Sequence, residues 1–155
     1  MTDTTFNRRT VLAGAGTGLF AAACVNLLPA SATATPAETE ELVKKLAGGA
    51  KAASGRITLK VPQIAENGNT VPFTVVVDSP MTEADHVKAI HVLAEENPWP
   101  GVASFTLGPD VGKAEVSMRM RLAKTQNVRA VAVMSDGSVW QVSQEVKVTI
   151  GGCGG

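Results

Sequence analysis

The sequence predicts an all-β domain, and three observations lead to this fold class. Seven short runs of apolar alternation or β-branched composition follow one another between residues 56 and 150. Turn signals rich in Gly, Pro, Asn and Asp separate these runs. No helical pattern alternates with them, which argues against a parallel α/β sheet. We therefore expect an immunoglobulin-like antiparallel β-sandwich, although the cysteine–tryptophan–cysteine core of antibody domains is absent.

One short amphipathic helix is expected before the strands, within a helix-and-linker segment over residues 35–55. Thr35 can act as an N-cap, and Pro36 suits the first helical position. Gly48 and Gly49 then weaken or end the helix. Its apolar side chains fall on one stripe, formed by Leu42, Val43, Leu46 and Ala47.

The strands of the predicted domain, residues 56–150, follow from the runs themselves. We expect them over residues 57–61, 71–77, 86–96, 102–107, 114–122, 128–134 and 139–150. The run 86–96 also fits a helix, but its alternation favours a strand buried on both faces. Asp136-Gly137 predicts a tight hairpin between the last two strands.

Composition excludes several classes of protein. The 155 residues contain 14 Lys and Arg against 14 Asp and Glu, so no basic face for nucleic acid is indicated. The two cysteines cannot build a disulfide framework or a four-cysteine zinc site. No phosphate loop and no nucleophile elbow occur in the sequence. The body of the chain therefore shows no catalytic constellation and implies no cofactor.

The first 34 residues have the organisation of a secretory signal peptide. Arg8 and Arg9 precede an uncharged stretch over residues 11–28, and small residues at Ala32 or Ala34 suit cleavage. Adjacent arginines indicate the twin-arginine route, which exports folded proteins. The apolar stretch is rich in Ala, Gly and Thr, which weakens the alternative of a retained membrane anchor. We expect a periplasmic protein.

The predicted cleavage separates the two cysteines. Cys24 lies inside the leader, and Ala21 is a poor fit to the position where a lipid-attachment signal usually has Leu. Cys153 would then be the single cysteine of the exported protein, with no internal partner for a disulfide. In an oxidising compartment such a thiol is prone to intermolecular disulfide bonding.

The segment 151–155 reads Gly-Gly-Cys-Gly-Gly and predicts a mobile arm. Gly151, Gly152, Gly154 and Gly155 leave the backbone unrestricted and remove every side chain except the Cys153 thiol. Five extended residues reach at most roughly 17 Å. No cation flanks Cys153, so we expect a carried thiol that is activated by the enzyme receiving it. The alternative is a frayed terminus with an incidental thiol.

Four other side chains are of types that can bind metals. His86 and His91 are five residues apart, which places them on opposite faces of a strand and makes a shared metal improbable. Met118 and Met120 share a strand face, where inward core packing is expected rather than a copper site.

Three more residues have alternative interpretations. Glu83 and Asp85 suggest paired carboxylates, but a polar turn explains them better. Trp99 lies between two prolines, and it is expected either at the edge of the core or in contact with a partner protein.

Taken together, several of these features resemble the SoxY family, the sulfur-carrier subunits of the bacterial Sox sulfur-oxidation system. They are the Arg8-Arg9 leader, the short helix, the small β domain and the terminal residues 148–155. The segment 87–98 also resembles that family. The resemblance covers essentially the whole chain, and its most specific part is the glycine-flanked Cys153.

The resemblance implies a covalent carrier rather than an enzyme. Cys153 would hold thiosulfate as a cysteine S-thiosulfonate, attached oxidatively by a haem-containing partner. A hydrolase would release sulfate, and a sulfur dehydrogenase would oxidise the remaining sulfur. A SoxZ-like subunit would complete a heterodimer. The alternative function is an exported interaction module whose Cys153 forms a permanent intermolecular disulfide.

Overall fold

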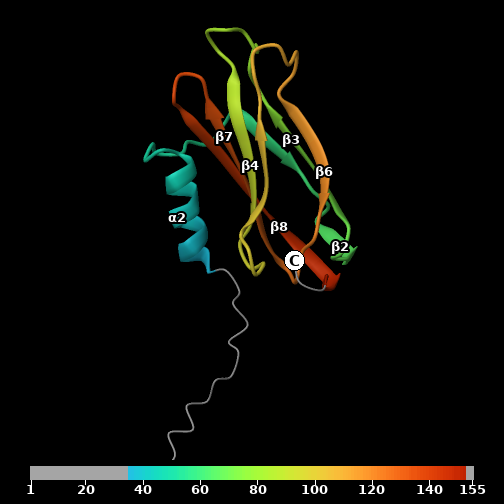
Figure 1. The fold of residues 1–155 in the computed structure, drawn as a ribbon. Helices are drawn as coiled ribbons and strands as arrows, with labels where there is room; N and C mark the ends of the chain where they lie inside the picture. Colours follow the sequence, from blue (N-terminus) through green and yellow to red (C-terminus); the bar gives the residue numbers. More distant parts are fainter. Residues whose placement is uncertain (1–34, 153–155) are drawn as a thin grey trace, which may run out of the picture. The chain divides into compact units, whose positions relative to one another are not determined.

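The computed structural model describes residues 35–152, which form one short helix and eight β-strands (Figure 1). In chain order these are α2 (Pro36–Leu46), β1 (Ile57–Lys60), β2 (Ile64–Asn67), β3 (Val71–Val77), β4 (Val87–Ala94), β5 (Gly101–Thr106), β6 (Glu115–Met120), β7 (Gln126–Met134) and β8 (Val139–Ile150). The prediction of a mostly β chain with one short helix is confirmed. Among these residues no helix has the length and apolarity needed to cross a membrane.

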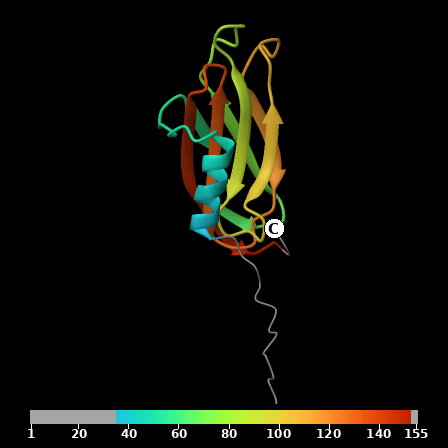
Figure 2. The same cartoon turned by 60° about the vertical axis from the view of Figure 1, so that its left-hand side comes forward.

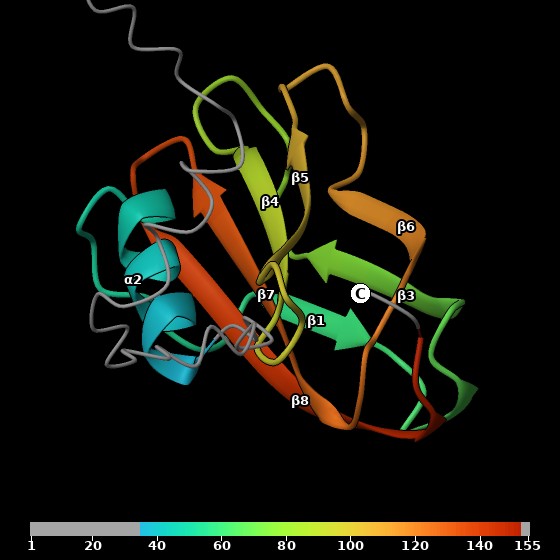
Figure 3. The ribbon, with the colours of Figure 1, turned by 60° about the horizontal axis from the view of Figure 1, so that its bottom comes forward.

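The strands form two sheets that share one hydrophobic core (Figures 1 and 3). The three-stranded sheet has the order β1-β3-β6, and the five-stranded sheet has the order β2-β8-β7-β4-β5. All pairings are antiparallel except that of β2 with β8. In β3 alternate side chains enter the core, where Phe73 is 2% exposed. In the five-stranded sheet Ile90 and Val128 are among the residues that meet them.

The helix α2 forms where the sequence predicts it. The Thr35 hydroxyl accepts a hydrogen bond from the Glu38 amide, and the Glu38 carboxylate accepts one from the Thr35 amide, a complete capping box. After the helix, Gly48 and Gly49 have φ of +58° and +85°, values that favour glycine.

Helix α2 covers the outer face of the five-stranded sheet (Figure 2). Val43 and Ala47 pack there against Leu93 of β4, Val131 of β7 and Val139 of β8. The end of β4 is therefore buried on both faces, since Val92, Leu93 and Ala94 are all buried. This explains the nearly continuous apolar sequence of β4 and confirms the expectation that it is a strand.

Strand β2 was not expected from the sequence. It pairs in parallel with the end of β8, with Ile64 opposite Lys147 and Asn67 opposite Ile150. Only Ala65 of its four residues is buried, while Ile64 is 62% exposed. A four-residue edge strand with one inward side chain has too short an alternation to be recognised.

The expectation that Met118 packs in the core is wrong. Met120 is 4% exposed, whereas Met118, on the same face of β6, is 53% exposed. Strand β6 is an edge strand, and Met118 lies opposite Phe73 in the pairing with β3. A side chain on an edge strand has neighbours on one side only, which leaves Met118 accessible to solvent.

Candidate functional site

The last described residues, Gly151 and Gly152, follow β8 and lie against two other segments of the chain. The Gly152 amide donates a hydrogen bond to the Leu122 carbonyl at 2.9 Å, and Gly152 is buried. Gly68 bridges the same two segments, because its amide donates to the Ile150 carbonyl at 2.7 Å and its carbonyl accepts from the Leu122 amide at 2.8 Å. We call Gly68, Leu122, Ala123, Gly151 and Gly152 the root junction, since the segment bearing Cys153 starts from it.

The backbones in the root junction approach too closely for a side chain at two positions, and they leave little room at a third. A Cβ atom on Gly151 would lie 2.1 Å from the Ala123 carbonyl oxygen, and one on Gly68 would lie 2.2 Å from the Leu122 carbonyl oxygen. A Cβ atom on Gly152 would lie 3.0 Å from the Gly68 carbonyl. Packing therefore demands glycine at Gly68 and Gly151, and a side chain at Gly152 would require its neighbours to shift. The sequence indicated only conformational freedom there, and the expected mobility of the arm stays a prediction.

Two buried amide side chains hold the segment that contains Leu122 and Ala123 in the root junction. Asn97 is 2% exposed; its Nδ2 donates to the Arg121 carbonyl at 2.9 Å, and its Oδ1 accepts from the Ala123 amide at 3.0 Å. Gln126, 3% exposed, donates from Nε2 to Asn97 Oδ1 at 2.8 Å and to the Lys124 carbonyl at 3.2 Å. Sequence reasoning missed both residues, because Asn97 before Pro98 has the appearance of an ordinary turn residue.

A small hollow of about 220 Å³ lies beside this support. Trp99 at its rim is 78% exposed, which excludes the core-edge interpretation and leaves partner contact as the prediction for this side chain. Arg119 and Arg121 also line it, and within residues 35–152 neither forms an ion pair. The remaining lining residues are Asn97, Gly101, Val102 and Met120.

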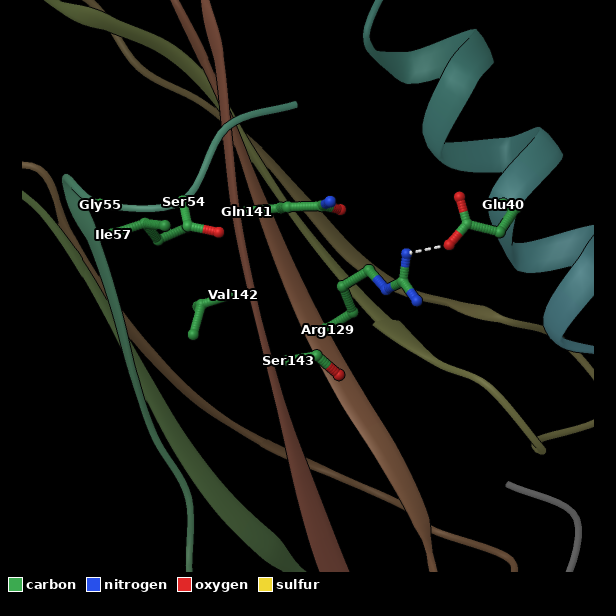
Figure 4. Close-up of a pocket in the computed structure, with 8 residues that line it drawn as sticks. All are labelled: Glu40, Ser54, Gly55, Ile57, Arg129, Gln141, Val142 and Ser143. Atoms are coloured by element: carbon green, nitrogen blue, oxygen red, sulfur yellow. Dashed lines mark hydrogen bonds and ion pairs between the residues drawn. The ribbon is translucent and has the colours of Figure 1, made fainter. Parts of the chain in front are cut away.

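A larger hollow of about 570 Å³ lies beside α2 and shares no residue with the root junction (Figure 4). Its principal charged group is Arg129 of β7, which pairs with Glu40 at 2.6 Å and with Glu95 at 2.7 Å. Burial would lower the pKa of Arg129, but the hydrogen bonds and charges of Glu40 and Glu95 outweigh it and raise the pKa. Arg129 thus ties the helix to the sheet.

The histidines and carboxylates singled out in the sequence do not assemble into a site. His91 Nδ1 lies 2.8 Å from the Ser104 hydroxyl, and burial lowers the pKa of His91. His86 Nδ1 lies 3.1 Å from the Thr82 carbonyl instead. Asp85 pairs with Arg56 at 3.0 Å. Among residues 35–152 no three His, Cys, Asp or Glu side chains come together in a way that could hold a metal ion.

The remaining predicted residues lie outside the part of the chain that the structure describes. They are Arg8, Arg9 and Cys24 of the predicted leader and Cys153, Gly154 and Gly155 of the predicted arm. The structure therefore defines where the arm starts, at the root junction.

Comparison with known proteins identifies the family. The family model described as "Sulfur oxidation protein SoxY" matches residues 43–153. The sulfur carrier protein SoxY from Chlorobium limicola f thiosulfatophilum is 36% identical, with a TM-score of 0.63, over 74% of this chain and 98% of that one. A search of curated proteins finds no match.

Superoxide reductases share the fold at much lower identity. The neelaredoxin from Ignicoccus hospitalis is 18% identical, with a TM-score of 0.54, over 74% of this chain and 94% of that one. A putative superoxide reductase from Thermotoga maritima is 18% identical, with a TM-score of 0.54, over 64% of this chain and 93% of that one. These two likenesses concern the fold alone. The family match and the 36% identical carrier together show that this chain belongs to the SoxY family.

Proposed function

We propose that this protein is a periplasmic sulfur carrier that holds thiosulfate-derived intermediates covalently on Cys153 and presents them to partner enzymes of sulfur oxidation. The observation that carries the proposal is the family match, which extends to residue 153 and so includes the cysteine. The 36% identical neighbour is itself a sulfur carrier protein. Arg8 and Arg9 would direct export by the twin-arginine route, and a SoxZ-like subunit would complete a heterodimer.

The loading step is an oxidation that needs an external electron acceptor. The Cys153 thiol loses its proton, a bond forms between its sulfur and the terminal sulfur of thiosulfate, and two electrons leave. A haem-containing partner accepts those electrons, giving a cysteine S-thiosulfonate. A hydrolase then adds water to the terminal sulfone and releases sulfate, and a sulfur dehydrogenase oxidises the sulfur left on Cys153.

The described surroundings of the arm support a carrier rather than an enzyme. The root junction consists of backbone amides and carbonyls, and the side chains that support it are the carboxamides of Asn97 and Gln126. None of these groups titrates near neutral pH, so none can act as a general base toward a thiol. Activation of Cys153 would therefore come from the active site that receives it.

The proposed working parts follow the fold. An immunoglobulin-like sandwich over residues 56–150 would serve as a rigid body, and residues 151–155 would form the arm. A carrier that visits several active sites needs a thin segment, and glycines around a single thiol provide the narrowest chain available.

Intact-mass measurement tests the proposal. The exported protein is purified from cells grown on thiosulfate, and its mass is compared with that of the Cys153→Ser variant. We expect adducts of thiosulfate or of additional sulfur on the unsubstituted chain and none on Cys153→Ser. Cys24→Ser is the matched control, since it removes the other cysteine and should keep every adduct.

Two results would contradict the carrier function. One is a chain whose Cys153 carries no sulfur adduct under any growth condition. The other is a mass that corresponds only to a permanent disulfide through Cys153, which would support the alternative of an interaction module.

A further inference from the structure

The root junction leaves a single peptide unit between a buried, hydrogen-bonded residue and the carrier thiol. We propose that Gly68 is a positioning residue for Cys153: its missing side chain lets Gly151 and Gly152 dock on the body, which fixes the point from which the segment bearing Cys153 starts. The proposal rests on the carrier function proposed above and adds to it a residue in the β2–β3 turn that no sequence motif singles out.

The first argument is steric. A Cβ atom on Gly152 would lie 3.0 Å from both the carbonyl carbon and the carbonyl oxygen of Gly68. A Cβ atom on Gly68 would lie 2.7 Å from the Gly152 amide nitrogen and 2.2 Å from the Leu122 carbonyl oxygen. All the atoms that it would meet at these distances belong to the backbone, so no flexible side chain can move aside. Even a methyl group at Gly68 therefore displaces the chain leading to Cys153.

The second argument is that the docked residues have specific partners. The Gly152 amide donates to the Leu122 carbonyl, and the Leu122 amide donates to the Gly68 carbonyl, so one residue links the turn to the arm. The partner segment is itself held by Asn97, through the Arg121 carbonyl and the Ala123 amide. Gly152 therefore docks on a segment that the Asn97 side chain holds in place.

The proposal explains why glycine stands at residue 151. Freedom of the backbone alone would be served by glycine anywhere in the segment. A Cβ atom on Gly151 would lie 2.1 Å from the Ala123 carbonyl oxygen. The docked arrangement therefore demands glycine at this position as well.

Hydrogen exchange and spin labelling test this docking in the full chain carrying Cys24→Ser, with no sulfur substrate present. In this background we expect the Gly152 amide to be protected from exchange, and a nitroxide on Cys153 to show a component of restricted mobility. Gly68→Ala should speed exchange at Gly152 at least tenfold and narrow the nitroxide lines. The exchange rate of the Val131 amide in β7 should change less than twofold, which would show that the fold persists.

Gly108→Ala is the matched control, because a Cβ atom on Gly108 meets nothing within 4 Å. It should leave both the Gly152 amide and the nitroxide unchanged. Gly151→Ala is the second variant. If Gly68→Ala removes protection at Val131, Gly151→Ala tests the docking in its place, because it alters the arm side of the same contact. It should release Gly152 as Gly68→Ala does.

The proposal is overturned if Gly152 exchanges freely in the Cys24→Ser background, or if Gly68→Ala and Gly151→Ala both leave it protected. These readouts are independent of sulfur chemistry. A chain that shows docking but carries no sulfur adduct would refute the carrier function alone, whereas a chain that carries adducts without protection at Gly152 would refute the docking alone.

Discussion

Asn97→Ala removes the side chain that supports the root junction. The variant loses three hydrogen bonds, to the Arg121 carbonyl, the Ala123 amide and the Gln126 side chain. Each is worth about 1 kcal/mol net, and buried groups left without a partner add to the loss. Gln126 keeps its bond to the Lys124 carbonyl, which limits the added cost. We expect the free energy of unfolding to fall by about 3 kcal/mol.

Urea denaturation followed by tryptophan fluorescence measures this loss. With a slope of about 1.5 kcal/mol per molar urea, the midpoint should fall by about 2 M. Asn127→Ala is the matched control, because this exposed side chain donates one hydrogen bond, to Glu95 at 3.1 Å, and should cost under about 1 kcal/mol. A loss below about 1 kcal/mol in Asn97→Ala, or equal losses in both variants, would refute the reasoning.

Two further predictions concern charged groups. Arg129→Ala leaves Glu95, whose side chain is 8% exposed, without its cation, and should lower the free energy of unfolding by about 3–5 kcal/mol. Adding Glu95→Gln should recover part of that loss in urea denaturation, and a double variant no more stable than the single one would contradict this account. Burial lowers the folded-state pKa of His91 below 6.5, so the unfolded chain binds the proton more readily and stability falls as pH drops through 6.5 toward the lower folded value. His91→Gln should therefore reduce the loss in urea midpoint between about pH 7 and about pH 5.5, and an unchanged loss would show that His91 does not contribute.

Local signals in the sequence predict the parts of the fold that depend on local physics. Thr35 and Pro36 predict the start of α2. The structure adds the hydrogen bond that the Thr35 amide donates to the Glu38 carboxylate. Asp136-Gly137 predicts the β7–β8 hairpin, where Gly137 has φ of +83°. In each case the residues that determine the geometry are neighbours in the chain.

The features that the sequence does not predict depend on contacts between distant segments. β2 is defined by its pairing with residues 147–150, and Met118 is exposed because it occupies a sheet edge. The docking of Gly152 needs Gly68 and Leu122, which lie far away in the chain. A run of glycines predicts freedom equally well whether or not another backbone lies against it, so the root junction has no local signature.

The parallel pairing of β2 with β8 has a consequence for the order of folding. It joins Ile64 to Lys147, a separation of roughly 80 residues, so it closes a far larger loop than any hairpin in the molecule. Because closing a long loop costs entropy, we expect this pairing to form after the local hairpins. The root junction is built on the same chain ends. A root junction with its hydrogen bonds in place therefore indicates that the pairing of β2 with β8 has formed as well.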